Sequence, residues 1–361
     1  NHAPDHFTSG SGREMSDLIL TQKGRAGCIT LNRPAALNAL TYQMCLDIEA
    51  QLCAWRDDPS VELIIIDAAG DKAFCAGGDI ADLYASAQRQ DYAFGQKFWA
   101  DEYRLNALID TYPKPYVAFM QGFVMGGGVG VSCHGSHRIV GETSQIAMPE
   151  VGIGLVPDVG GSALLAAAPG HLGEYLGTTA TRMNAGDAIY VGFADHFIPQ
   201  DQWANAKTAL QENGIAALSA FYAEAPDSDL KGALPDINAV FSGARMRDIL
   251  AAAENSTAPF AARAAKAIGR NSPLAMAVAL DMIRSLRATK ATVAEALVQE
   301  YRFTARAIEF GDFAEGIRAA IIDKDKNPQW KHALGAVPQE MVDHMRAPLG
   351  DMELNLTGEQ S

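Results

Sequence analysis

The sequence lacks long hydrophobic runs and is poor in positive charge. No apolar stretch approaches the ~20 residues that span a bilayer, so no membrane role is expected. Lys and Arg total 29 against 43 Asp and Glu, which gives a formal net charge of -14. Because phosphate neutralisation supplies most non-specific nucleic-acid affinity, nucleic acid is not an expected partner. Any anionic ligand must be held by local donors.

Cysteine is also scarce, and its spacing has no regular pattern. The sequence contains five Cys residues, an odd number, and shows no secretory signal. This usage predicts reduced, buried thiols and a cytoplasmic location. The stretch 1–14 is small, polar and without periodicity, and Met15 follows it, so we expect it to be a remnant of cloning outside the fold.

Metal-ligand clusters are not apparent. The segment "CHGSH" contains Cys133, His134 and His137, but no second Cys/His cluster exists, and structural zinc needs four ligands at a defined spacing. The sequence therefore favours hydrogen-bonded histidines, with His137 starting a strand, over a metal site.

Strand and helix patterns alternate from Leu18 to about Phe197, which predicts an α/β core. A hairpin, a helix capped by Thr41, the buried strands "VELIIIDA" and "PYVAFMQG", and a helix near 92–110 are expected. Beyond Phe197 the sequence is first polar and Ala-rich, and it then shows the amphipathic pattern of helices. The predicted organisation is a core at 15–200, an irregular helical linker region at 201–260, a C-terminal helical region at 261–347 and a disordered tail at 348–361.

Two glycine-rich turns follow buried strands, "KAFCAGGDI" at 72–80 and "MGGGVGVS" at 125–132. The spacing excludes a phosphate loop, a dinucleotide fingerprint and a serine nucleophile elbow. Two explanations stay open for each turn. The glycines allow close packing of strand on helix, or their backbone amides form an oxyanion hole that polarises a carbonyl group.

Two acids stand eight residues apart in "AMPEVGIGLVPDVGG", an apolar loop segment that contains Glu150 and Asp158. A carboxylate in such surroundings is desolvated and can be tuned as a general acid or base. The alternative, which the residues leave open, is a structural role in a turn or cap. Asp158 in particular precedes "VGGSALL" as a candidate N-cap.

Taken together, "KAFCAGGDI", "QGFVMGGGVGVSCHG", "AMPEVGIGLVPDVGG" and "GDFAEGIRAAIIDKDKNPQW" resemble the crotonase (enoyl-CoA hydratase/isomerase) superfamily. The likeness extends from about Asp17 to Trp330 and is greatest to the 3-hydroxyisobutyryl-CoA hydrolase branch. It implies a crotonase-like spiral of repeated ββα units with a helical C-terminal region. It also implies an acyl-CoA small-molecule substrate and no separate cofactor, since coenzyme A is part of the substrate.

The resemblance assigns roles to particular residues. It places the oxyanion-hole amides on Gly78 and Gly127 and the catalytic carboxylates on Glu150 and Asp158, with Glu102 as a further substrate contact. Coenzyme A is expected along "AALNAL" and "CAGGDI", at Ala36, Leu37, Ala76, Gly78 and Ile80.

One position departs from the hydratase pattern. Hydratases of the superfamily place a second catalytic glutamate where this chain has Gly130, so thioester hydrolysis is expected instead, most specifically of 3-hydroxyisobutyryl-CoA in valine degradation. Alternatives are an enoyl-CoA hydratase or isomerase that uses one glutamate, and a non-catalytic CoA-binding protein. The resemblance leaves open a homo-oligomer, because a C-terminal extension can instead fold over its own site.

Overall fold

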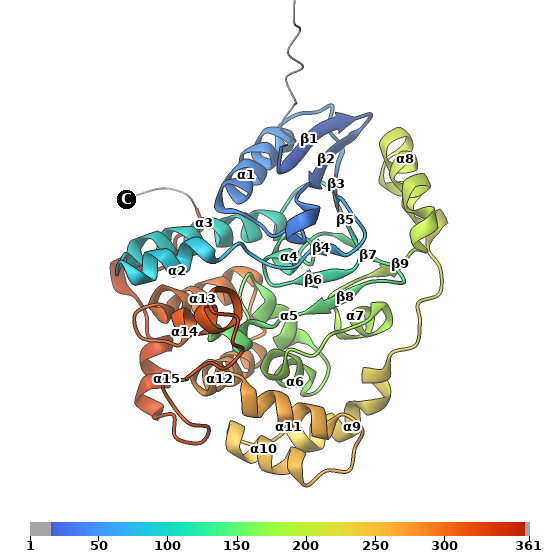
Figure 1. The fold of residues 1–361 in the computed structure, drawn as a ribbon. Coiled ribbons are helices and arrows are strands. Elements are labelled where there is room, and N and C mark those ends of the chain that lie inside the picture. Colours follow the sequence, from blue (N-terminus) through green and yellow to red (C-terminus); the bar gives the residue numbers. More distant parts are fainter. Residues whose placement is uncertain (1–15, 358–361) are drawn as a thin grey trace, which may run out of the picture.

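The computed structural model describes residues 16–357. The predicted cloning remnant lies outside these residues. The chain forms two sheets surrounded by helices (Figure 1), so the predicted α/β class is confirmed. The strands are β1 (Leu18–Lys23), β2 (Ala26–Leu31), β3 (Leu63–Ala68), β4 (Ala73–Cys75), β5 (Tyr116–Met120), β6 (Phe123–Met125), β7 (His137–Val140), β8 (Gln145–Ala147) and β9 (His196–Phe197).

The chain visits the two sheets in alternation. The larger sheet has the order β1-β2-β3-β5-β7-β9 and the smaller one β4-β6-β8, and every pairing except the β1/β2 hairpin is parallel. Along the chain, β3, β5 and β7 of the larger sheet are each followed by a strand of the smaller sheet, namely β4, β6 and β8 in turn. This succession produces a spiral of repeated strand pairs with helices between them.

Helices α1 (Tyr42–Arg56), α2 (Ala81–Gln88) and α3 (Tyr92–Asp110) connect the first turns of this spiral. The Thr41 side chain accepts a hydrogen bond from the Met44 amide and caps α1 as predicted. The bounds of α3 also agree with the expected helix. Shorter helices follow, namely α4 (Gly127–Gly130), α5 (Gly161–Ala167), α6 (Leu172–Thr179) and α7 (Ala185–Val191).

Strand β3 is buried on both faces, as its continuous apolar run predicts. Ile64 and Ile66 point into the main core, whereas Leu63 and Ile65 point into a second, smaller core on the opposite face of the sheet. Helix α8 (Trp203–Asn213) covers that second core with Trp203 and other apolar side chains (Figure 1).

The segment 201–260 is more regular than predicted. It contains α8, α9 (Asp229–Phe241) and α10 (Met246–Glu254), joined by a 3-10 turn at Ile215–Phe221 and a short extended stretch. Their apolar residues belong to the two cores, so the segment packs as part of the body. Its high alanine content hid this in the sequence, because alanine buries little area and gives a weak amphipathic signal.

The C-terminal helices are α11 (Ala261–Arg270), α12 (Pro273–Thr289), α13 (Val293–Ala307), α14 (Phe313–Ile317) and α15 (Gln339–Arg346). In Figure 1 they lie to the left of the smaller sheet and below it, with α13 packed against α3 and α12 against α5 and α6. Within 16–357, no helix is long and apolar enough to cross a membrane.

The disorder predicted for the tail is wrong for residues 348–357. A 3-10 turn forms at Gly350–Met352, and Leu354 is buried in the main core. Arg302 on α13 donates a 2.6 Å hydrogen bond to Glu353. This ion pair and the apolar side chains of Leu349, Leu354 and Leu356 hold the tail against the body, and such features are too isolated in sequence to show a pattern.

Candidate active site

The smaller sheet brings three predicted site residues to one edge. Strands β4, β6 and β8 are parallel neighbours in that order, so their carboxyl ends lie side by side. Gly78 follows β4 by three residues, Gly127 follows β6 by two, and Glu150 follows β8 by three. The central position of β6 therefore puts Gly127 between the other two.

The amides of Gly78 and Gly127 are close together. A Cβ atom built on Gly127 would lie 3.4 Å from the Gly78 nitrogen. Neither amide donates to an acceptor among residues 16–357. Since an unpaired backbone amide at a partly buried position is free to bind a ligand oxygen, this geometry suits a carbonyl held by two N–H donors.

Both turns depend on glycine for their backbone path. Gly77 has φ +129° and Gly126 has φ +52° with ψ -117°. Residues other than glycine rarely adopt these backbone conformations. A Cβ on Gly126 would lie 3.7 Å from the Gly77 Cα and 3.9 Å from Glu150 Oε2. The two turns therefore place backbone atoms and the Glu150 carboxylate around the same small space beside Gly126.

Glu150 is buried and lacks a hydrogen-bond partner for either carboxyl oxygen among the described residues. Burial, reinforced by the nearby charge of Asp158, raises its pKa well above the ordinary value. A carboxylate in this state is poorly solvated, which makes it a strong base or nucleophile once it is ionised.

Glu102 and Asp158 lie in the same site. Glu102, on α3, has its Oε1 atom 3.2 Å from the position of a Cβ on Gly127. Burial raises its pKa to about 8, with a further contribution from Asp158. Burial raises the pKa of Asp158 to about 7, although the Tyr103 hydroxyl donates a 2.6 Å hydrogen bond to it and opposes the shift.

These raised pKa values predict that stability falls as the pH rises. The folded protein retains protons on Glu102 and Asp158 up to about pH 8 and 7, whereas the unfolded chain releases them near 4.5 and 3.8. Because the native state then binds more protons, the free energy of unfolding decreases between about pH 4 and 8. Urea unfolding at pH 5 and pH 8 measures this, and Glu102→Gln should flatten the dependence. A wild-type protein that gains stability over this interval would contradict the prediction.

Asp158 does not cap a helix, so the N-cap role considered for it is wrong, although its carbonyl accepts a 2.7 Å hydrogen bond from the Gly161 amide in a turn. Gly160, with φ +78°, is the N-cap of α5. The carboxylate of Asp158 instead accepts a hydrogen bond from the Tyr103 hydroxyl on α3.

The acid that supports α5 is Glu300, which the sequence analysis missed. It lies on α13, is fully buried, and accepts hydrogen bonds from the Gly160 amide at 2.9 Å and from the Ser162 amide and hydroxyl at 3.1 and 2.5 Å. Only the amphipathic pattern of α13 could have indicated its burial. A C-terminal helix of the same chain thus fixes the loop that holds Asp158.

Gly130 has no room for an acidic side chain. A Cβ there would lie 2.6 Å from Asn106 Nδ2 and 2.8 Å from the Val159 Cβ, closer than real Cβ contacts allow. A second carboxylate at this position would require α3 and the loop after Glu150 to move apart. The absence of an acid at this position is therefore built into the packing.

The segments predicted to contact coenzyme A lie next to the amide pair. The Ala76 amide donates to the Leu37 carbonyl at 3.0 Å. Leu40 and Gly78 form a parallel bridge. Ala36 is exposed and Ile80 half-buried at the start of α2. The structure brings these residues together at one rim of the site, and their contact with coenzyme A stays a prediction.

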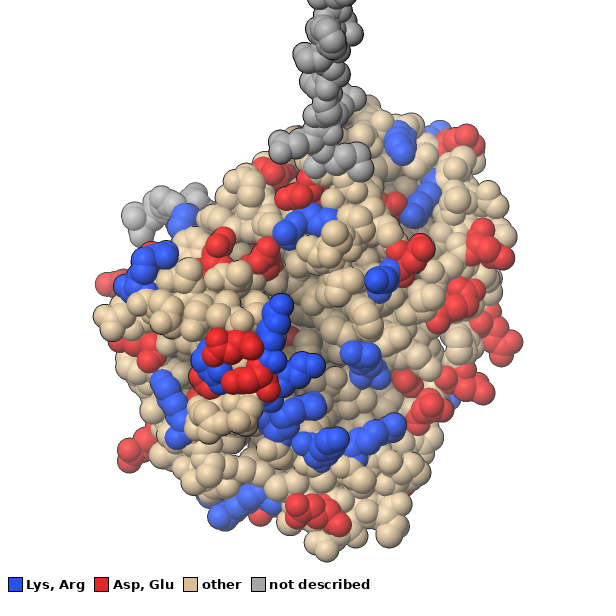
Figure 2. All heavy atoms as spheres, viewed as in Figure 1, with Lys and Arg blue, Asp and Glu red and all other residues tan. Residues whose placement is uncertain are grey.

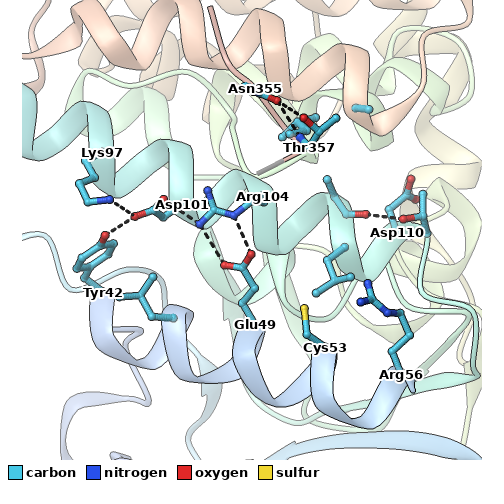
Figure 3. Close-up of a pocket in the computed structure, with 16 residues that line it drawn as sticks. Tyr42, Glu49, Cys53, Arg56, Lys97, Asp101, Arg104, Asp110, Asn355 and Thr357 are labelled. Carbon is cyan, nitrogen blue, oxygen red and sulfur yellow. Dashed lines mark hydrogen bonds and ion pairs between the residues drawn. The ribbon is translucent and has the colours of Figure 1, made fainter. Parts of the chain in front are cut away.

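A separate cleft of about 1130 Å³ lies between α1 and α3, on the other side of α3 from the site (Figure 3). Arg104 bridges Glu49 at 2.7 Å and Asp101 at 2.9 Å within it. Asp101 thus points into the cleft while its neighbour Glu102 points into the site. Lys97 also pairs with Asp101, at 3.2 Å, so the Asp101 carboxylate is held by two cations, unlike the unpaired carboxyl of Glu150.

The histidines after the triple glycine are hydrogen-bonded, and among the described residues no group of three His, Cys, Asp or Glu side chains could hold a metal ion. His134 is buried with its Nε2 atom 2.7 Å from the Val159 carbonyl. His137 starts β7 and contacts the Ser136 hydroxyl at 2.8 Å. Both histidines are explained by the fold.

Two backbone amides aimed at one space, with desolvated carboxyl groups around them, define an α/β enzyme that acts on a carbonyl compound. A family model described as enoyl-CoA hydratase/isomerase matches residues 26–345. The chain belongs to the enoyl-CoA hydratase/isomerase family, and the predicted crotonase-like fold is confirmed.

Individual relatives extend over nearly the whole chain. The mitochondrial 3-hydroxyisobutyryl-CoA hydrolase of Gallus gallus is 37% identical, covering 94% of this chain and 91% of its own. A solved structure described as an enoyl-CoA hydratase from Rhodobacter sphaeroides 2.4.1 is 52% identical with a TM-score of 0.92, covering 94% of this chain and 100% of that one. Another, described as a carnitinyl-CoA dehydratase from Mycobacterium thermoresistibile, is 42% identical with a TM-score of 0.91, covering 96% and 100%.

Proposed function

We propose that this protein is a thioesterase that hydrolyses 3-hydroxyisobutyryl-CoA to 3-hydroxyisobutyrate and coenzyme A, a step of valine degradation. The packing around Gly130 is the observation that favours hydrolysis, because it leaves the site with amides and Glu150 but without room for a second acid on that turn. The hydrolase name of the Gallus gallus relative agrees with this assignment.

In the proposed reaction, the amides of Gly78 and Gly127 bind the thioester oxygen and stabilise the oxyanion. Glu150 then acts by one of two routes. It attacks the carbonyl carbon, expels the thiolate of coenzyme A and forms an anhydride that water cleaves, or it removes a proton from a water molecule that attacks directly. Asp158, with a pKa of about 7, can hold a proton and supply it to the departing sulfur.

The charge distribution supports an anionic ligand. Although the chain has a net charge of -14, Lys and Arg side chains gather beside a hollow on the face drawn in Figure 2. Such a local concentration attracts phosphate groups even when the whole molecule repels them. The proposal needs no separate cofactor, since coenzyme A arrives as part of the substrate.

Release of free thiol on mixing with 3-hydroxyisobutyryl-CoA tests the proposal. A thiol reagent should detect one coenzyme A per substrate consumed, and a panel of 3-hydroxypropionyl-CoA and simple short acyl-CoAs should show the acyl preference. Hydration of crotonyl-CoA without thiol release would instead support an enoyl-CoA hydratase, the activity in the description of the 52% identical structure. Turnover that stays at background with every acyl-CoA would favour a non-catalytic CoA-binding protein.

Location and assembly stay predictions. The curated Gallus gallus relative is named as mitochondrial, whereas the cysteine pattern of this chain predicts a cytoplasmic protein. Within the described part of the chain, Glu300 on α13 holds the segment Gly160–Ser162 that follows Asp158, so a C-terminal helix of the same chain supports the proposed site.

A further inference from the structure

Asn106 on α3 is a polar side chain that the proposed chemistry does not use. It is fully buried, and neither its Nδ2 nor its Oδ1 atom has a hydrogen-bond partner among residues 16–357. A buried amide left unpaired in this way destabilises the folded protein. Only a few buried polar groups per 100 residues are unsatisfied in native proteins, and each calls for an explanation.

The position of Asn106 relates it to the amide pair. Glu102, one helical turn earlier on the same face of α3, lies beside Gly127 at the start of α4. Asn106 lies beside Gly130 at the end of α4, with its Nδ2 atom 2.6 Å from the position of a Cβ there. The two ends of α4 are about 4.5 Å apart along its axis.

This spacing matches the substrate. In a 3-hydroxyacyl thioester three bonds separate the carbonyl carbon from the hydroxyl oxygen, a span of about 3.8 Å when extended, as between successive Cα atoms. An acyl chain that starts at the amides of Gly78 and Gly127 and runs along α4 places its hydroxyl near Asn106. A hydroxyl both donates and accepts a hydrogen bond, and an amide side chain offers both complements.

We propose that Asn106 is the specificity-determining residue that binds the hydroxyl of the acyl group. This inference rests on the proposed thioesterase function. Glu150 likewise lacks partners for its carboxyl oxygens. Both side chains are buried, so the substrate must part the packing around them as it enters. Interface side chains commonly shift in this way on binding. Binding would then satisfy the buried amide, which an acyl group without a hydroxyl would leave unpaired.

The test compares 3-hydroxyisobutyryl-CoA with isobutyryl-CoA, which lacks only the hydroxyl. A site built to bind a hydroxyl can reject such an analogue by up to about 10⁴- to 10⁵-fold, and we expect at least about 100-fold in kcat/KM for the wild-type enzyme. In Asn106→Leu, which has nearly the same volume, kcat/KM for the hydroxylated substrate should fall about 100-fold. The value for isobutyryl-CoA should stay within about threefold, so the preference disappears.

Asn271→Leu is the matched control. Asn271 is also buried, but its Nδ2 atom is satisfied by the Thr178 carbonyl at 2.9 Å, so its loss should lower stability without changing the ratio of the two substrates. Equal losses on both substrates in Asn106→Leu would overturn the inference, because they would show a structural role or a role in holding water. If Asn106→Leu does not fold, the wild-type enzyme alone can overturn the inference, by showing nearly equal kcat/KM values for the two thioesters. Failure of the proposed function looks different, since neither thioester would then release thiol.

Discussion

Replacing Glu150 by Gln is expected to lower kcat for thioester hydrolysis about 10³-fold. General acid-base catalysis contributes about 10²- to 10⁴-fold, and the amide of Gln can neither accept a proton from water nor form an anhydride. The shape of the side chain is kept, and the oxyanion hole of Gly78 and Gly127 is untouched. Thiol release under saturating substrate measures the change.

The same replacement should not destabilise the fold. The carboxyl of Glu150 has no hydrogen-bond partner within 16–357 and its pKa is raised by burial, so an ionised Glu150 lowers stability at high pH. Glu150→Gln should therefore unfold at pH 8 at an equal or higher urea concentration than the wild type. Glu340→Gln, at an exposed position of α15, is the matched control and should change neither property. A Glu150→Gln enzyme that hydrolyses at the wild-type rate would refute the assignment.

The two chemical routes for Glu150 differ in a measurable intermediate. In the anhydride route, rapid quenching of a single turnover should yield intact protein heavier by the acyl group. Direct attack by water leaves the protein mass unchanged throughout. Because both routes need the carboxylate, the loss in Glu150→Gln is expected in either case.

The sequence contained enough to place the centre of this site. The alternation of buried strands with glycine turns predicts that the residues after parallel strands meet at one edge, and Gly78, Gly127 and Glu150 do so. These positions depend on local order along the chain, so a linear pattern can reveal them. The resemblance to a known family then separated an oxyanion hole from mere close packing, which the glycines alone could not do.

Side chains that reach the site across long sequence separations were missed. Glu300 binds the backbone of Gly160 although 140 residues separate them, and Tyr103 holds Asp158 from another helix. An amphipathic pattern predicts that such residues are buried but not what they contact. The linker region and the tail were misjudged for a related reason, because alanine-rich helices and single anchors such as Leu354 give little periodic signal.

Replacing Gly127 by Ala should lower kcat about 10²- to 10³-fold, the usual effect of losing one oxyanion-hole donor. The added methyl would lie 3.4 Å from the Gly78 nitrogen and 3.2 Å from Glu102 Oε1, in the space that the thioester oxygen needs to reach both amides. The backbone of Gly127 is helical rather than left-handed, so alanine suits its conformation, and the 3.2 Å contact requires the Glu102 side chain to move by only a few tenths of an ångström. The loss should therefore appear in the chemical step more than in stability.

Gly269→Ala is the control for this change. Gly269 lies exposed on α11, where an added Cβ meets nothing within 4 Å. There alanine should stabilise the protein by about 1 kcal/mol through helix propensity and leave kcat unchanged. Since both variants add one methyl group to a helical glycine, they differ only in what the methyl obstructs. A kcat for Gly127→Ala within about threefold of the wild type would mean that its amide is not aimed at the reacting oxygen, and the proposed hole would then retain Gly78 alone.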